Sequence, residues 1–282
     1  MRIMHANAAS LADADTAARF DERPSREDAE QGALGDGWLI AVLGAVAGHL
    51  PEEITRRIAE RPDGNYLVSL AEARCTASGA VPTGRTIEMS VTQDLPVYDH
   101  SPGEPAYAKA DRVGWAAIAE KALAGVDASW NTRRQTQWAQ SWDRLCAADA
   151  ADAHVVRPRC GPPPTGYVRL GNSGTAFDQA EALTQLTGRQ AAVRYLPARR
   201  GPIRRTLRRQ LGAHRPVIVT IRPYAAAGEV LPHRLVADQV YEITRVRWRT
   251  AVLRNPWGYH HPGPVPLTAL ASLTMPGYAT LT

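Results

Sequence analysis

The apolar positions in the first half of the chain repeat mainly at helical spacing. A nearly continuous apolar run over residues 37–48 follows a glycine-rich turn, and Asp36 stands where a helix N-cap is expected. Pro51 favours the start of a second helix through the segment PEEITRRIAER. The segment VGWAAIAEKALAGV, residues 113–126, predicts a third helix. These patterns indicate a first half that is mainly helical.

Strands are expected mainly in the second half, after a linker. The stretch RPRCGPPPTG, residues 157–166, holds four prolines and two glycines and is the strongest linker signal. Two helices should follow it, at 176–188 and within the arginine-rich segment 199–215. Alternating or β-branched segments predict strands at 65–70, 85–91, 216–221, 238–246 and 250–257.

This pattern predicts an α+β protein with two lobes. We expect a polar lead-in over residues 1–28 that wraps a domain or stays loose, because it is rich in Asp and Arg. A helical lobe should cover residues 29–160, and a β-rich lobe residues 161–282.

The composition says more about where the protein is expected to be located than about what it does. The 282 residues are 44% hydrophobic, enough for a sizeable core, and the net charge of +5 indicates no class of partner by itself. The N-terminus lacks a continuous apolar segment, so neither a signal peptide nor a membrane anchor is predicted. The three cysteines, Cys75, Cys146 and Cys160, lack metal-ligand spacing and are interpreted as packed or incidental thiols. We expect a cytoplasmic protein without a metal or cofactor.

Two segments have motif-like sequences. QGALGDGWLIA (residues 31–41) resembles the active-site signature of the calpain-type cysteine proteases, Q-G-x-L-G-D-C-W/Y-x-x-A, and LRNPWG (residues 253–258) resembles the asparagine motif of that family. Weaker similarities lie between them in the family's order, at LPV (95–97), WAAIAEKALA (115–124) and ALTQLTG (182–188). The resemblance covers roughly residues 25 to 275.

The resemblance implies a papain-like fold, in which a helical lobe presents a cysteine nucleophile and a β-rich lobe supplies histidine and asparagine across a cleft. Gln31 matches the family's oxyanion glutamine, Asn255 its orienting asparagine, and Trp257 the tryptophan that shields the histidine–asparagine pair. The nucleophile position holds Gly37, and the histidine position in the strand DQVYEIT holds Gln239. Because neither residue can transfer a proton, the chain is not expected to act as a cysteine protease.

Several groups should nevertheless remain in the cleft, beside Asp36 and Trp38 of the same motif. The Gly37 N–H and the Gln31 amide could still polarise a carbonyl or hold a carboxylate. Gln239 and Asn255 could hydrogen-bond each other and keep the old geometry neutral. The exchange of cysteine for glycine should also open space at the cleft floor. The alternative is that these groups only stabilise the fold.

The leading functional hypothesis is a catalytically dead, bacterial-type calpain-like pseudoprotease that binds a peptide, protein or small molecule in the inherited cleft. The alternative is an enzyme that uses the oxyanion-type pocket for cyclisation, isomerisation or condensation in natural-product biosynthesis. The helix Arg199–Arg215 has Ile203, Leu207 and Leu211 at intervals of four, and its basic face is interpreted as solvated. Its other interpretation is a docking face for an acidic partner. The absence of aromatic residues nearby in the sequence argues against nucleic acid, and no membrane association is expected.

Overall fold

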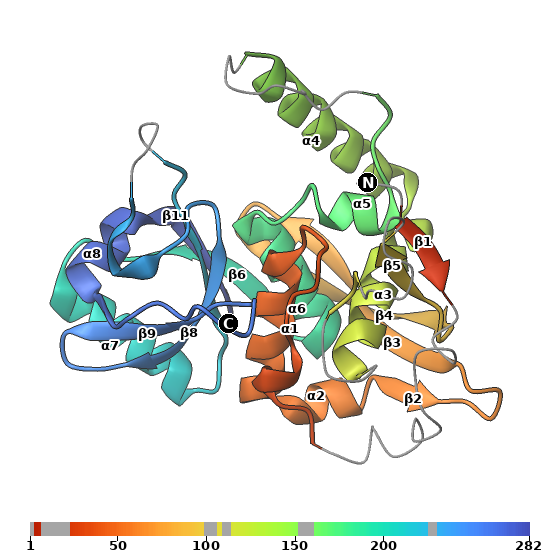
Figure 1. Cartoon of the computed structure of the whole chain (residues 1–282), viewed down its shortest axis with the longest axis horizontal. Coiled ribbons are helices and arrows are strands. Elements are labelled where there is room, and N and C mark those ends of the chain that lie inside the picture. Colours follow the sequence, from red (N-terminus) through yellow and green to blue (C-terminus); the bar gives the residue numbers. More distant parts are fainter. Residues whose placement is uncertain (1–2, 7–22, 99–105, 109–113, 152–160, 225–229) are drawn as a thin grey trace.

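The computed structural model describes residues 3–6, 23–98, 106–108, 114–151, 161–224 and 230–282, and it is an α+β protein as predicted (Figure 1). The α-helices of these ranges are α1 (Gly37–His49), α2 (Pro51–Thr55), α3 (Trp115–Gly125), α4 (Thr132–Ala151), α5 (Gly166–Leu170), α6 (Ala176–Thr187), α7 (Arg200–Gly212) and α8 (Leu267–Leu273). Short 3-10 turns lie at Arg26–Asp28, Val126–Ser129 and Pro232–Arg234. None of the helices in these ranges has both the length and the apolar composition that a membrane span requires.

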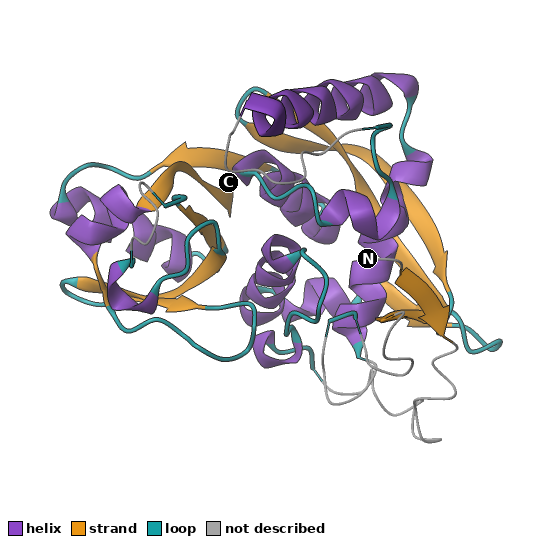
Figure 2. Cartoon of the chain, turned by 45° about the horizontal axis from the view of Figure 1, so that its top comes forward, coloured by secondary structure: helices purple, strands orange, loops and turns teal. Residues whose placement is uncertain are grey.

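The strands form a two-stranded sheet and a nine-stranded antiparallel sheet that runs through both halves of the molecule (Figure 2). The strands are β1 (Ile3–Ala6), β2 (Ile58–Glu60), β3 (Tyr66–Thr76), β4 (Gly79–Val91), β5 (Leu95–Tyr98), β6 (Ala191–Tyr195), β7 (Val217–Ile221), β8 (Val240–Val246), β9 (Thr250–Arg254), β10 (Val265–Pro266) and β11 (Thr274–Leu281). The large sheet has the order β10-β9-β8-β7-β11-β6-β4-β3-β2, and β1 pairs with β5. A short β4–β6 pairing joins the hairpin β3–β4 to the strands of the second half.

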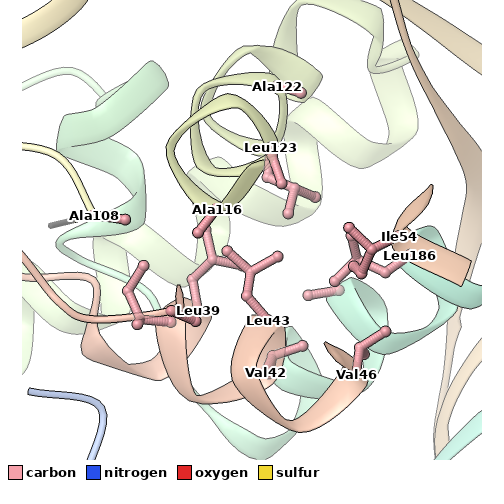
Figure 3. Close-up of a cluster of buried hydrophobic side chains, with 14 of the residues drawn as sticks. Leu39, Val42, Leu43, Val46, Ile54, Ala108, Ala116, Ala122, Leu123 and Leu186 are labelled. Carbon is pink, nitrogen blue, oxygen red and sulfur yellow. The ribbon is translucent and has the colours of Figure 1, made fainter. Parts of the chain in front are cut away.

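The first core surrounds α1. This helix is apolar on every side, and all residues from Gly37 to Ala47 are buried, as expected for a helix enclosed by other elements. Figure 3 shows Leu39 and Leu43 of α1 close to Ala116 and Leu123 of α3, with Leu186 of α6 beside them. Burial of these side chains fixes the position of α1, whose first residues belong to the signature motif.

The second core lies between α7, α8 and the strands β7 to β11. Ile203 and Leu207 from α7 are fully buried against Val219 and Tyr241 of the sheet. The two cores do not divide at the expected boundary after residue 160, because α5 and α6 lie beyond it and pack in the first core.

The strand content of the first lobe exceeds the expectation of a helical lobe. The hairpin β3–β4 is longer than the alternating segments suggested, and β2 adds a third strand beside it. The helix expected from Pro51 therefore ends at Thr55, because the chain from Ile58 onward pairs with β3. Part of the expected lead-in is also structured, since Ile3–Ala6 pairs with β5, while residues 7–22 lie outside the described ranges.

Candidate functional site

Direct contacts within the chain bring together four of the sequence-predicted site residues. The Gln31 side chain lies against Gly37 at the start of α1, and the Gln31 backbone N–H donates to the carbonyl of Pro256 at 2.8 Å. Asn255, which precedes this proline, accepts a hydrogen bond from Nε2 of Gln239 at 3.1 Å. The start of α1, the start of β8 and the end of β9 therefore meet at one place.

The space beside Gly37 is filled by the carboxamide of Gln31. A Cβ at position 37 would overlap Oε1 of Gln31 and would lie 3.0 Å from its Cδ. The Gln31 Nε2 donates to the Leu34 carbonyl at 2.6 Å, so the amide is turned toward its own loop. The expectation of open space at the cleft floor is wrong, because this flexible side chain occupies the volume that glycine leaves free.

The Gln239–Asn255 pair is neutral and hydrogen-bonded, as the sequence predicted. Asn255 is fully buried, and its Oδ1 also accepts from the Trp257 backbone N–H at 3.1 Å. The Asn255 backbone N–H donates to Nδ1 of His261 at 3.1 Å, and burial, with a smaller contribution from Arg254, lowers the pKa of that histidine. His261 therefore supports the asparagine loop as a neutral acceptor.

The two tryptophans of the motifs differ in what they contribute. Trp38 is buried, its Nε1 donates to the Leu170 carbonyl at 2.9 Å, and Gly174 lies directly against its ring. It therefore packs α1 against the loop between α5 and α6, and its N–H group is already bonded. Trp257 is half-buried and its ring centroid lies 6.0 Å from that of Tyr259, so part of its ring remains available to a ligand.

Asp36 is placed away from solvent. It holds the N-cap position of α1, but its side chain makes no capping hydrogen bond and faces Glu120 of α3 instead. Burial raises the pKa of Asp36 to about 6, against a smaller lowering by the hydrogen bond from Glu120. Burial, followed by the charge of Asp36, raises the pKa of Glu120 well above its usual range, and Glu120 accepts from the Ala108 N–H at 2.6 Å. Burial of two neighbouring carboxyl groups therefore favours their protonated forms, and both groups lie too deep to meet a ligand.

A glutamine in place of Glu120 is expected to make the protein more stable at alkaline pH. The pKa values of Asp36 and Glu120 are both raised in the folded state, so folding of the wild type takes up protons. The stability that this uptake contributes is fully present below about pH 4 and is lost as the pH rises through about 6 and above. Glu120→Gln keeps an acceptor for Ala108 and gives Asp36 a permanent donor. We expect a gain of about 1–3 kcal/mol at pH 8, with little change at pH 4. Urea unfolding across this range measures it, and a difference independent of pH would contradict it.

The segment that carries Gln31 is tied to the second lobe by a buried carboxylate. Glu242 of β8 is 1% exposed and accepts two hydrogen bonds from Arg26, at 3.2 and 3.0 Å. His49, at the end of α1, lies 3.5 Å from the same carboxylate. Arg254 donates to the Ala29 carbonyl at 2.8 Å. These contacts place the segment between the lobes and set the position of Gln31.

A groove of about 1220 Å³ adjoins this site. Its α4 wall presents Arg133, Arg134, Gln137, Trp138, Gln140, Ser141, Arg144 and Leu145, and the opposite wall presents Arg74–Ala77, Gly171–Ser173, Thr175, Phe177, Asp178, Glu181 and Asp238. Asp238 precedes Gln239 in the chain, and the Gly171 backbone lies against Gly35 of the signature loop. The groove therefore reaches the Gln31–Gly37 region from one side.

The groove combines exposed guanidinium and amide groups with a few apolar side chains. Arg134 is neutralised by Glu181 through two hydrogen bonds, at 3.1 and 2.6 Å. Arg74 and Arg133 are exposed and make no ion pair with the acids of the described ranges. Gln137 and Gln140 are exposed on the α4 wall. The sequence did not reveal this groove, because residues 132–151 have only a polar helical pattern and nothing in it indicates a partner.

The cysteines offer no substitute nucleophile in the described ranges. Burial and the nearby Glu181 raise the pKa of Cys75 to about 12, so its thiol stays protonated at neutral pH. Cys146 is half-buried, and Cys160 lies outside the described residues. Where the chain is described, no cluster of three or more His, Cys, Asp and Glu side chains is arranged to hold a metal ion.

Comparison with known proteins adds no relative to this picture. No protein-family model matches the sequence, and no curated protein does either. The similarity to calpain-type proteases thus rests on the motifs around Gly37 and Asn255.

Proposed function

We propose that this protein is a calpain-like pseudoprotease that binds an extended peptide segment in the groove beside its degenerate triad and does not cleave it. The observation that carries the proposal is the neutral Gln239–Asn255 pair, together with the filled space at Gly37. Thiol proteolysis requires a nucleophile and a base at these two positions.

The state of Gln31 argues against the alternative of a repurposed enzyme. An oxyanion site needs donors that point at the substrate oxygen before the reaction begins. Here Nε2 of Gln31 donates its hydrogen bond to the Leu34 carbonyl, and Oε1 is the atom that lies against Gly37. A carbonyl placed above Gly37 would meet the acceptor end of this amide, which favours binding over catalysis.

The groove supports a peptide as the ligand. The exposed amides of Gln137 and Gln140 can pair with the donors and acceptors of an extended backbone, and the half-buried Asn172 and Ser173 add polar groups on the opposite wall. The side chain of Phe177, 43% exposed, offers an apolar contact on the opposite wall. The volume of about 1220 Å³ exceeds what a small metabolite needs.

The test is selection of peptides from a random displayed library on the full-length protein, followed by affinity measurement with a synthetic copy of a selected peptide. We expect the peptide to remain intact after prolonged incubation. Gln140→Trp, which places a bulky ring in the groove, should weaken binding at least about tenfold, since it removes an amide and blocks the space. Fluorescence anisotropy measures the affinity and mass spectrometry follows the peptide.

Thr136→Trp is the matched control, because Thr136 is an exposed residue of the same helix that does not line the groove. Its affinity for the peptide should equal that of the wild type. Any of three results would overturn the proposal: equal affinities for both variants, failure to select any peptide, or cleavage that a thiol alkylator blocks.

A further inference from the structure

The two parts of the chain differ strongly in charge. Residues 182–282 contain 15 arginines and three carboxylates, whereas residues 1–181 contain 18 basic and 25 acidic side chains. The overall net charge of +5 hides this separation. The basic part, residues 182–282, is therefore suited to bind a polyanion, and the side chains on its surface indicate which class of polyanion it binds.

The tertiary structure places an exposed tryptophan beside the arginine-rich helix. Trp248 lies in the turn between β8 and β9, about forty residues after α7 in the sequence, and is 65% exposed. The guanidinium of Arg204 lies over its ring, 4.1 Å from the centroid. Figure 1 shows α7 beside the β8–β9 hairpin, in agreement with the packing of α7 on β8. The aromatic partner that the sequence near α7 lacked is thus supplied by the fold.

The arginines around Trp248 have no acidic partners in the described part of the chain. One side of α7 carries arginines at four-residue intervals, Arg200, Arg204 and Arg208. Arg205 is exposed next to them, and Arg249 follows Trp248 in the turn. We call these five arginines and Trp248 the arginine surface. None of the five forms an ion pair with a described carboxylate. Glu27 and Glu30 line a separate depression together with Arg245 and Arg247.

The burial of α7 excludes insertion into a membrane as the purpose of this charge. An amphipathic helix binds a lipid surface through its apolar face. The apolar face of α7 is already used, because Ile203 and Leu207 are fully buried in the second core. An acidic protein would pair with the guanidinium groups but has no general use for the open face of the indole ring.

We propose that the arginine surface binds single-stranded nucleic acid. The arginines contact phosphates, and the free face of Trp248 stacks with an unpaired base. Stacking on the indole holds the Arg204 guanidinium in one orientation and leaves its N–H edge free for bidentate contact with a phosphate. This activity is independent of the peptide groove, which is lined by other residues.

The test uses a fluorescent oligothymidylate of about 20 nucleotides and the full-length protein, with anisotropy measured between about 50 and 200 mM salt. We expect binding that weakens as salt rises. Arg205→Ser combined with Arg208→Ser should make the log–log salt dependence shallower by about 1.4, because two phosphate contacts are lost. Trp248→Ala should weaken binding about 5- to 100-fold without changing that slope, and Trp248→Phe should restore most of the affinity.

Arg61→Glu is the matched control, since it changes the charge by the same two units at an exposed arginine of the first lobe that forms no ion pair with a described carboxylate, and it should leave binding unchanged. Circular dichroism verifies that each variant is folded. No binding at the lowest salt, or equal loss from the control, overturns the proposal. It is also overturned if polyglutamate or phosphatidylserine vesicles bind as tightly as the oligonucleotide and Trp248→Ala has no effect.

Discussion

Replacing Glu242 with alanine is expected to lower the free energy of unfolding by about 3 kcal/mol. The carboxylate is 1% exposed and joins three elements, since it holds Arg26 through two hydrogen bonds and lies beside His49. Its removal leaves Arg26 and the buried Arg254 without the negative charge between them. The segment that carries Gln31 should then separate from β8, so peptide binding should weaken as well.

Chemical unfolding of the variant measures the loss, and Glu72→Ala is the matched control. Glu72 also forms a doubly hydrogen-bonded pair with an arginine, Arg85, but on the exposed hairpin β3–β4. Its removal should have little effect, because water and salt screen a surface pair. Equal losses for the two variants would show that Glu242 has no special role between the lobes.

Gly32→Ala is expected to destabilise the protein by about 3 kcal/mol, because two backbone segments cross there. A Cβ at position 32 would overlap the carbonyl oxygen of Tyr107. That segment cannot easily move, since the Ala106 carbonyl accepts from the N–H groups of Ala33 and Leu34, both at 3.2 Å. The alanine must therefore break these hydrogen bonds or displace Gln31.

Gly35→Ala, in the same loop, provides the comparison. Its Cβ would make only ordinary contacts, 3.7 Å from Gly171, so thermal unfolding should differ little from that of the wild type. If the Gly32→Ala and Gly35→Ala variants unfold at the same temperature, the close crossing at Tyr107 is contradicted.

The sequence predicted the elements whose patterns are local. The apolar run after Asp36 forms α1, and the segment 176–188 forms α6, with a capping box at Thr175 and a left-handed glycine at Gly188. The Gln239–Asn255 hydrogen bond was also predicted, because the two residues match the histidine and asparagine positions of the calpain-type motifs that this sequence resembles. The polar helix α4 gave no indication of a groove, since its partners come from β3 and α6.

By itself, the sequence predicted an α+β protein, and its resemblance to the calpain-type proteases placed Gly37 and Gln239 where that family has its nucleophile and base. The tertiary structure alone decided that Gln31 fills the space at Gly37, that Asp36 is buried beside Glu120, and that Trp248 meets Arg204. The physical reason is the range of the interactions: helical and strand patterns depend on neighbours a few residues apart, whereas side-chain overlap, desolvation and ring stacking depend on distances that exist only after folding.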